Sequence, residues 1–250
     1  SLGSRPAYMS EPFSDDPDDR GLLSDEMHPP SAMRDRLMHA DARGLQLRVH
    51  AIGDRAISMM LDIFADIEKE HGYHDQRFAI EHAQHMAQKD FERFAKLRVI
   101  ASMQPYHAID DGRWAEPRLG HDRARYSYAW RSFLDHGVTL AFGTDWPVAP
   151  LDPMLGVYAA VTRATLDGKN PGGWIPEEKI TLPEAIEAYT IGSAFAEFQE
   201  REKGSITPGK LADIVIVSDN IFDMKPEAIR NVKVQTTIFG GRVIYSRAGN

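Results

Sequence analysis

The sequence contains no cysteine, which excludes disulfide bonds and thiolate chemistry. It has no apolar run of about 18 residues and no basic-then-apolar leader, so it predicts neither a membrane span nor a signal peptide. Positive charge is scarce, because 29 Lys and Arg stand against 37 Asp and Glu, for a net charge of -8. No basic stripe is present to neutralise phosphates. These absences argue against nucleic acid and membrane as partners and favour a cytoplasmic location.

What the chain does contain is typical of a globular protein. Its 250 residues are 42% hydrophobic and 26% charged, which is enough for one large domain or two small ones. Residues 1–43 differ from the rest, because EPFSDDPDDRG and MHPPS are rich in Pro, Asp and Ser. This composition predicts a surface loop, and a disordered end is equally compatible with it.

From residue 44 onward, apolar strands alternate with amphipathic helices. Strands are predicted at 45–50, 77–82, 98–105 and 138–145, and helices at 55–72, 87–96 and 126–136. This alternation indicates an α/β fold with parallel strands. Further along, we expect helices at 150–165 and 181–198, then strands at 213–217 and 236–245, the latter turning on Gly240 and Gly241.

Polar side chains stand at the carboxyl ends of the four predicted strands, where His50, His82, Gln104 and Asp145 fall. Parallel strands direct these ends into one shared mouth, where catalytic groups gather. From the residues alone, a metal or acid–base site and a structural polar network are equally good interpretations. Asp145 has a second alternative, a helix cap or Asx-turn before Pro147.

Several motifs then carry a specific resemblance. VHAIGDRA (49–56), IEHAQ (80–84), FGTDWPV (142–148) and GSITPGKLADIVIVSDN (204–220) occur in this order. The opening SLGSRPA fits the same pattern. Together they resemble the second half of the metal-dependent amidohydrolase superfamily, most closely the branch that includes N-substituted formamide deformylase. The resemblance extends over nearly the whole chain.

The resemblance implies a (β/α)8 TIM barrel that holds one or two divalent ions, usually zinc. His50 matches the ligand on the fifth barrel strand, His82 that on the sixth and Asp145 that on the eighth. The family's His-x-His pair of strand one and its strand-four ligand have no counterpart in this sequence. We therefore expect a loop-rich segment at 1–43, the C-terminal half of a barrel at 44–200 and part of a small β-sandwich at 201–250.

The implied reaction is hydrolysis of a non-peptide C–N bond, in an amide, formamide or cyclic amide, by metal-activated water. We expect this activity only together with the missing N-terminal half of the barrel. Zinc accepts histidine nitrogen and carboxylate oxygen, and it lowers the pKa of bound water to about 7. Asp145 would take the proton from this water and pass it to the leaving nitrogen. With an incomplete ligand set we expect low metal occupancy. The competing hypothesis is a non-catalytic amidohydrolase-like fragment with an interaction or regulatory role.

Substrate contacts are less sharply defined. Gln104, Tyr106 and His107 could line the substrate pocket, and a plain loop role is as probable for them. Trp146 could pack over the mouth or fill the core. For the remaining histidines in helical or polar surroundings we expect solvated or capping roles: His71, His74, His85, His121 and His136.

Half a barrel cannot bury its own strand edges. Four parallel strands leave two open edges and an uncovered apolar face, and such edges pair readily with another chain. We therefore expect either a homo-oligomer or association with the missing N-terminal half of the barrel.

Overall fold

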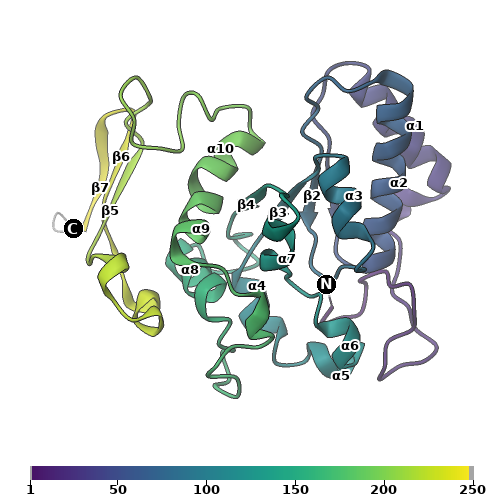
Figure 1. Ribbon diagram of the computed structural model, residues 1–250, viewed down its shortest axis with the longest axis horizontal. Helices are drawn as coiled ribbons and strands as arrows, with labels where there is room; N and C mark the ends of the chain where they lie inside the picture. Colours follow the sequence, from purple (N-terminus) through teal and green to yellow (C-terminus); the bar gives the residue numbers. More distant parts are fainter. Residues whose placement is uncertain (1, 248–250) are drawn as a thin grey trace. The chain divides into compact units, whose positions relative to one another are not determined.

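Four strands form a sheet in the order β1 (Arg48–Ala51), β2 (Ala79–His82), β3 (Ile100–Met103) and β4 (Leu140–Phe142) in the computed structural model, which describes residues 2–247 (Figure 1). β1 pairs with β2, and β2 with β3, in parallel. At the start of β4, Ala101 N donates to Thr139 O at 3.0 Å. The α/β class and the parallel sheet are therefore confirmed.

The chain divides into two compact units. The first holds the chain up to Met103 together with Asp110–Leu140, and the second holds Gln104–Ile109 and the chain from Ala141 onward. The boundary between Ile109 and Asp110 falls within α4 (Tyr106–Asp111).

Helices of the first unit follow the predicted alternation. α2 (Asp54–His71) contacts β1, α1 (Pro30–Asp41) and α3 (Asp90–Lys96). Its apolar positions recur at helical spacing and are buried, and Gly72, with a φ of 78°, ends it. Four shorter helices complete the unit: η1 (Asp25–Met27), α5 (Ala115–Leu119), α6 (His121–Ala124) and α7 (Trp130–Asp135).

The N-terminal segment is more ordered than its composition suggests. Residues Pro30–Asp41 form α1, so the loop prediction is wrong there. Leu2, Ala7 and Phe13 are buried, and Arg118 donates to the carboxylate of Asp15 at 2.8 Å. The Pro29–Pro30 pair that suggested a loop starts the helix instead, since a proline in the first helical turn removes only an N–H that has no helical partner.

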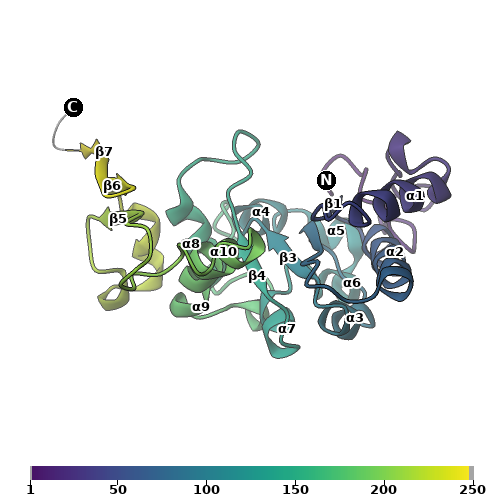
Figure 2. The same cartoon turned by 90° about the horizontal axis from the view of Figure 1, so that it is seen from above.

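The second unit begins with α8 (Pro153–Thr162), which is followed by a long helical stretch. This stretch comprises α9 (Leu182–Glu187), the π-helical turn η3 (Ala188–Gly192) and α10 (Ser193–Ala196). A separate three-stranded antiparallel sheet contains β5 (Ile214–Val217), β6 (Val234–Phe239) and β7 (Arg242–Ser246), side by side in Figure 2. The predicted turn on Gly240 and Gly241 is confirmed, with φ values of 54° and 77°. Short 3-10 helices are η2 (Pro176–Glu178), η4 (Ile221–Asp223) and η5 (Pro226–Asn231).

Among the described residues, none of the helices combines the length and the apolar character that crossing a bilayer requires.

Candidate metal centre

Two histidines meet at the ends of the neighbouring strands β1 and β2. The parallel register pairs Ala51 with His82 and His50 with Glu81, so the two imidazoles are diagonal neighbours. Their ring centroids lie 4.5 Å apart in an edge-to-face arrangement. His82 is buried and His50 is exposed. The sequence prediction that these two side chains converge at one sheet edge therefore agrees with the structure.

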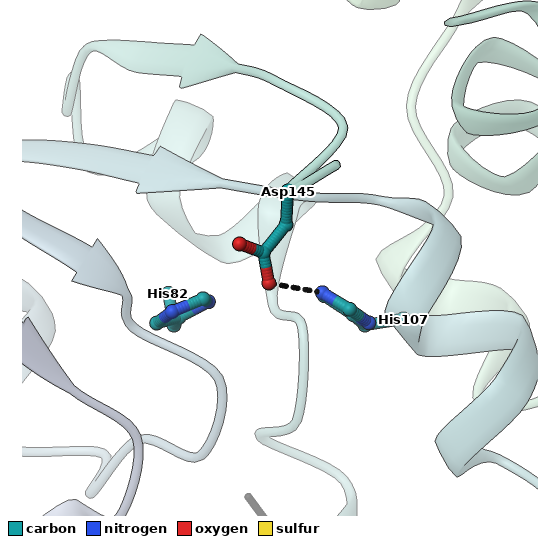
Figure 3. Close-up of side chains that lie close together, drawn as sticks. All are labelled: His82, His107 and Asp145. Carbon is teal, nitrogen blue, oxygen red and sulfur yellow. Dashed lines mark hydrogen bonds and ion pairs between the residues drawn. The ribbon is translucent and has the colours of Figure 1, made fainter. Parts of the chain in front are cut away.

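The third predicted ligand, Asp145, lies just beyond β4, in the turn Gly143–Thr144–Asp145. Its Oδ2 is 3.0 Å from Nε2 of His107, which stands at the start of α4 (Figure 3). Both side chains are largely buried, with 31% of Asp145 and 16% of His107 exposed. A carboxylate in partial burial needs such a partner, because losing water without a compensating contact would be costly.

The backbone at two of these positions is unusual. His82 has a φ of 76° and Asp145 a φ of 62°, both in the left-handed region that non-glycine residues seldom adopt. Hydrogen bonds hold both turns, because Ala83 N donates to Ala51 O at 3.1 Å and Val148 N donates to Asp145 O at 2.8 Å. Strained backbone that is held in place in this way is concentrated at functional sites.

His82, His107 and Asp145 can each offer one ligand atom, and these atoms lie within 4.8 Å of one another (Figure 3). Two imidazole nitrogens and a carboxylate oxygen are donors that zinc and related divalent ions accept. Ligands about 2.0–2.1 Å from a tetrahedral ion are roughly 3.3 Å apart, close to the His107–Asp145 separation. The donor set therefore fits a divalent cation.

Sequence reasoning assigned the members of this group differently. His50 was predicted as a ligand and His107 as a substrate contact, whereas the group contains His107 and His50 stands beside it through its ring contact with His82. A weak signal was available, because His107 follows the polar end of the third strand by only three residues.

The other predicted substrate contacts are placed as follows. Gln104 is buried at the end of β3, and Tyr106 is half-buried as the first residue of α4. Trp146 has 64% of its surface exposed, which contradicts the alternative that it fills the core. The capping alternative for Asp145 also finds no support, since Asp152 caps α8 by accepting from Met154 N at 3.0 Å.

One histidine departs from its expected solvated role. His85 is only 1% exposed, and its Nδ1 lies 2.8 Å from Ser127 Oγ. Burial lowers the pKa of His85 to about 3, so its imidazole is neutral at ordinary pH. The ring of Tyr128 stands edge-on to the imidazole of His85, with centroids 5.8 Å apart.

Comparison with known proteins identifies the chain. The profile described as "Amidohydrolase family" matches residues 1–245. The chain belongs to this family. N-substituted formamide deformylase from Arthrobacter pascens is a relative, 28% identical over 221 residues, which cover 88% of this chain and 40% of the relative. The predicted superfamily is therefore confirmed.

Two further proteins match over similar ranges. The protein LONG AFTER FAR-RED 3 of Arabidopsis thaliana is 40% identical over 246 residues, covering 98% of this chain and 41% of that protein. An uncharacterized metal-dependent hydrolase from Pyrococcus horikoshii OT3 has a crystal structure that aligns with a TM-score of 0.76 and 32% identity. That alignment covers 90% of this chain and 44% of the other. The chain thus spans less than half the length of these relatives.

Proposed function

We propose that this chain forms part of a metal-dependent hydrolase that cleaves a non-peptide C–N bond, such as an amide, formamide or cyclic amide. Membership of the amidohydrolase family supports hydrolysis, and the name of the Arthrobacter relative supports the C–N bond class. The observation that carries the proposal is the grouping of His82, His107 and Asp145 beyond strand ends. In this proposal the parallel strands and their helices are the C-terminal half of a (β/α)8 barrel, and β5–β7 belong to a β-sandwich.

His82 and Asp145 would hold the divalent cation, which we propose is zinc, together with His107 or His50. When bound, such a cation supplies Lewis-acid chemistry, which polarises a carbonyl oxygen and acidifies water. Asp145 accepts a proton from the attacking water on a carboxylate oxygen and returns it to the leaving nitrogen. His107, 3.0 Å away, fixes which carboxylate oxygen remains available for this proton.

Titration of the purified chain with Zn²⁺ and Co²⁺ by calorimetry tests the cation site. We expect His82→Ala to weaken cation binding about tenfold or more. Mutations of residues that only support metal ligands already lower metal affinity by about this factor. His121→Ala is the matched control, because the side chain of His121 is 82% exposed and lies outside the group. Equal affinities for the wild-type chain and His82→Ala would refute the site.

Hydrolysis is tested separately on the chain together with the N-terminal half of the barrel, with N-formyl amines, simple amides and cyclic amides as substrates and amine release as the readout. We expect activity to require added divalent cation and to be lost in Asp145→Asn. Activity that survives both a chelator and Asp145→Asn would refute the proposed reaction.

A further inference from the structure

The π-helical turn η3 is a helical segment whose geometry differs from the one that the sequence pattern predicts. The apolar spacing of residues 181–198 predicts a single regular helix, yet the structure places a π turn over Ala188–Gly192. Such turns insert one extra residue, are unfavourable in themselves and occur frequently at functional sites. Tyr189 within η3 and Ser193 directly after it make hydrogen bonds outside their own helical stretch.

Both side chains reach the end of β4. Tyr189 Oη donates to the carbonyl of Gly143 at 3.3 Å, and Ser193 Oγ lies 3.0 Å from the carbonyl of Phe142. Ser193 Oγ is also 2.9 Å from the carbonyl of Ala188, within the turn itself. Tyr189 of η3 and Ser193, the first residue of α10, thus place hydroxyl groups against the carbonyls of the last residue of β4 and of the residue that follows it.

Packing fixes Tyr189 in this position. Its ring meets Phe142 edge-on, with centroids 5.4 Å apart. Its hydroxyl lies directly over Gly156 of α8, where an added Cβ would stand 1.8 Å from Oη and 2.9 Å from Cζ. Only glycine leaves room there. Burial also raises the pKa of the Tyr189 hydroxyl above its ordinary value, so the group keeps its proton and remains a donor.

We propose that Tyr189, held by the η3 turn and by Gly156, is a positioning residue for Asp145. The carbonyl that it binds lies two residues before Asp145, at the base of the turn in which Asp145 adopts its left-handed backbone. The bond limits how far Gly143 and Thr144 can move, and so sets the direction in which the carboxylate leaves the strand. This inference rests on the proposed role of Asp145.

Tyr189→Phe is the direct test, because it removes the hydroxyl and keeps the ring against Phe142. We expect amide hydrogen exchange at residues 143–145 to accelerate about 2- to 10-fold, as for the loss of one hydrogen bond, and Co²⁺ affinity to fall about tenfold. Tyr158→Phe is the matched control, since Tyr158 is a buried tyrosine of α8 that donates no hydrogen bond to this strand end. Unchanged exchange at 143–145, or an equal change in the control, would overturn the proposal.

Gly156→Ala probes the same arrangement from the opposite side. The new methyl group would push Tyr189 away, so we expect the loss of Co²⁺ affinity to match that of Tyr189→Phe. In the double variant the two losses should not add, because they remove one shared contact. Full additivity would overturn the proposed link between Gly156 and Tyr189.

The outcomes separate this inference from the proposed function. If the wild-type chain binds no cation while Tyr189→Phe still accelerates exchange at 143–145, the metal proposal fails and the support of the strand end stands. If exchange accelerates but Co²⁺ affinity is unchanged, Tyr189 does not position Asp145 for a cation and the inference fails.

Discussion

The left-handed backbone at Asp145 determines which substitutions of this residue preserve the fold. With a φ of 62°, this position tolerates asparagine better than alanine, since asparagine visits this region readily. Asp145→Asn should therefore keep the fold and remove only the charge. We expect its melting temperature to stay near that of the wild-type chain while Zn²⁺ affinity falls at least about tenfold.

Calorimetric titration and thermal unfolding of the same samples check this expectation. Asp135→Asn is the control for loss of one carboxylate, because Asp135 is exposed and pairs only with Arg131 in the described chain. Wild-type affinity in Asp145→Asn would show that its carboxylate does not contact the ion.

The burial of His85 makes the free energy of unfolding depend on pH. Its pKa is lowered from the ordinary 6.5 to about 3 by burial, so between these values the unfolded chain takes up a proton that the folded chain refuses. The stabilisation is complete above about pH 6.5 and is lost progressively as the pH falls towards 3. This single group should contribute a slope of up to about 1.4 kcal/mol per pH unit.

Urea unfolding between pH 7 and pH 5 measures this slope. His85→Asn removes the titrating ring while keeping an amide near the position of Nδ1, which faces Ser127. We expect the free energy of unfolding of this variant to fall less steeply with acid than that of the wild-type chain. Parallel pH profiles would contradict a neutral buried imidazole.

The sequence could predict those site residues that lie at the carboxyl ends of strands. His50, His82 and Asp145 each follow an apolar strand, and a parallel sheet brings such positions to one edge. The pairing of His107 with Asp145 was not predictable in this way. It depends on where α4 begins and which way its first turn faces, and neither is encoded in apolar periodicity.

At the level of elements, prediction succeeded where the hydrophobic pattern is long. α2 has 18 residues with a repeating buried face, and its predicted extent agrees with the structure. The short helices α4, α5 and α6 have four to six residues each, too few for a periodic signal. The η3 turn was missed for a different reason, because Tyr189 and Ser193 contact the end of β4 and apolar spacing carries no signal of such tertiary contacts.

The capping box of α9 offers a test at this scale. Glu184 N donates to Thr181 Oγ1 at 3.4 Å, and Thr181 N donates to Glu184 Oε2 at 2.7 Å, so each residue satisfies the other's free N–H. Thr181→Ala should lower the free energy of unfolding by about 1 kcal/mol. Urea denaturation measures the loss, Thr181→Ser should restore most of it, and an unchanged midpoint in Thr181→Ala would show that α9 does not depend on its cap.

For the molecule as a whole, the outer edge of β1 is where the four-stranded sheet ends among residues 2–247. β1 pairs with β2 on one side, and no other strand of residues 2–247 pairs with its second edge. A cavity of about 540 Å³ lies against it and is lined by five successive residues, Arg48 to Ile52. Because neighbouring strand residues point to opposite faces, lining by all five places the cavity along the edge of the strand. Apolar side chains such as Leu22, Met27 and Met33 form much of its wall.

A sheet that ends beside an apolar cavity can accept a further strand. We therefore expect the isolated chain to self-associate at micromolar concentration through this edge, with a sedimentation coefficient that rises with concentration. Leu22→Lys, at an exposed position in the wall, should weaken association because a lysine would have to be buried. Leu45→Lys is the control, since Leu45 is also exposed but lies outside the wall. A single monomeric species at every concentration would show that this edge is satisfied without a partner, and equal weakening in both variants would place the contact elsewhere.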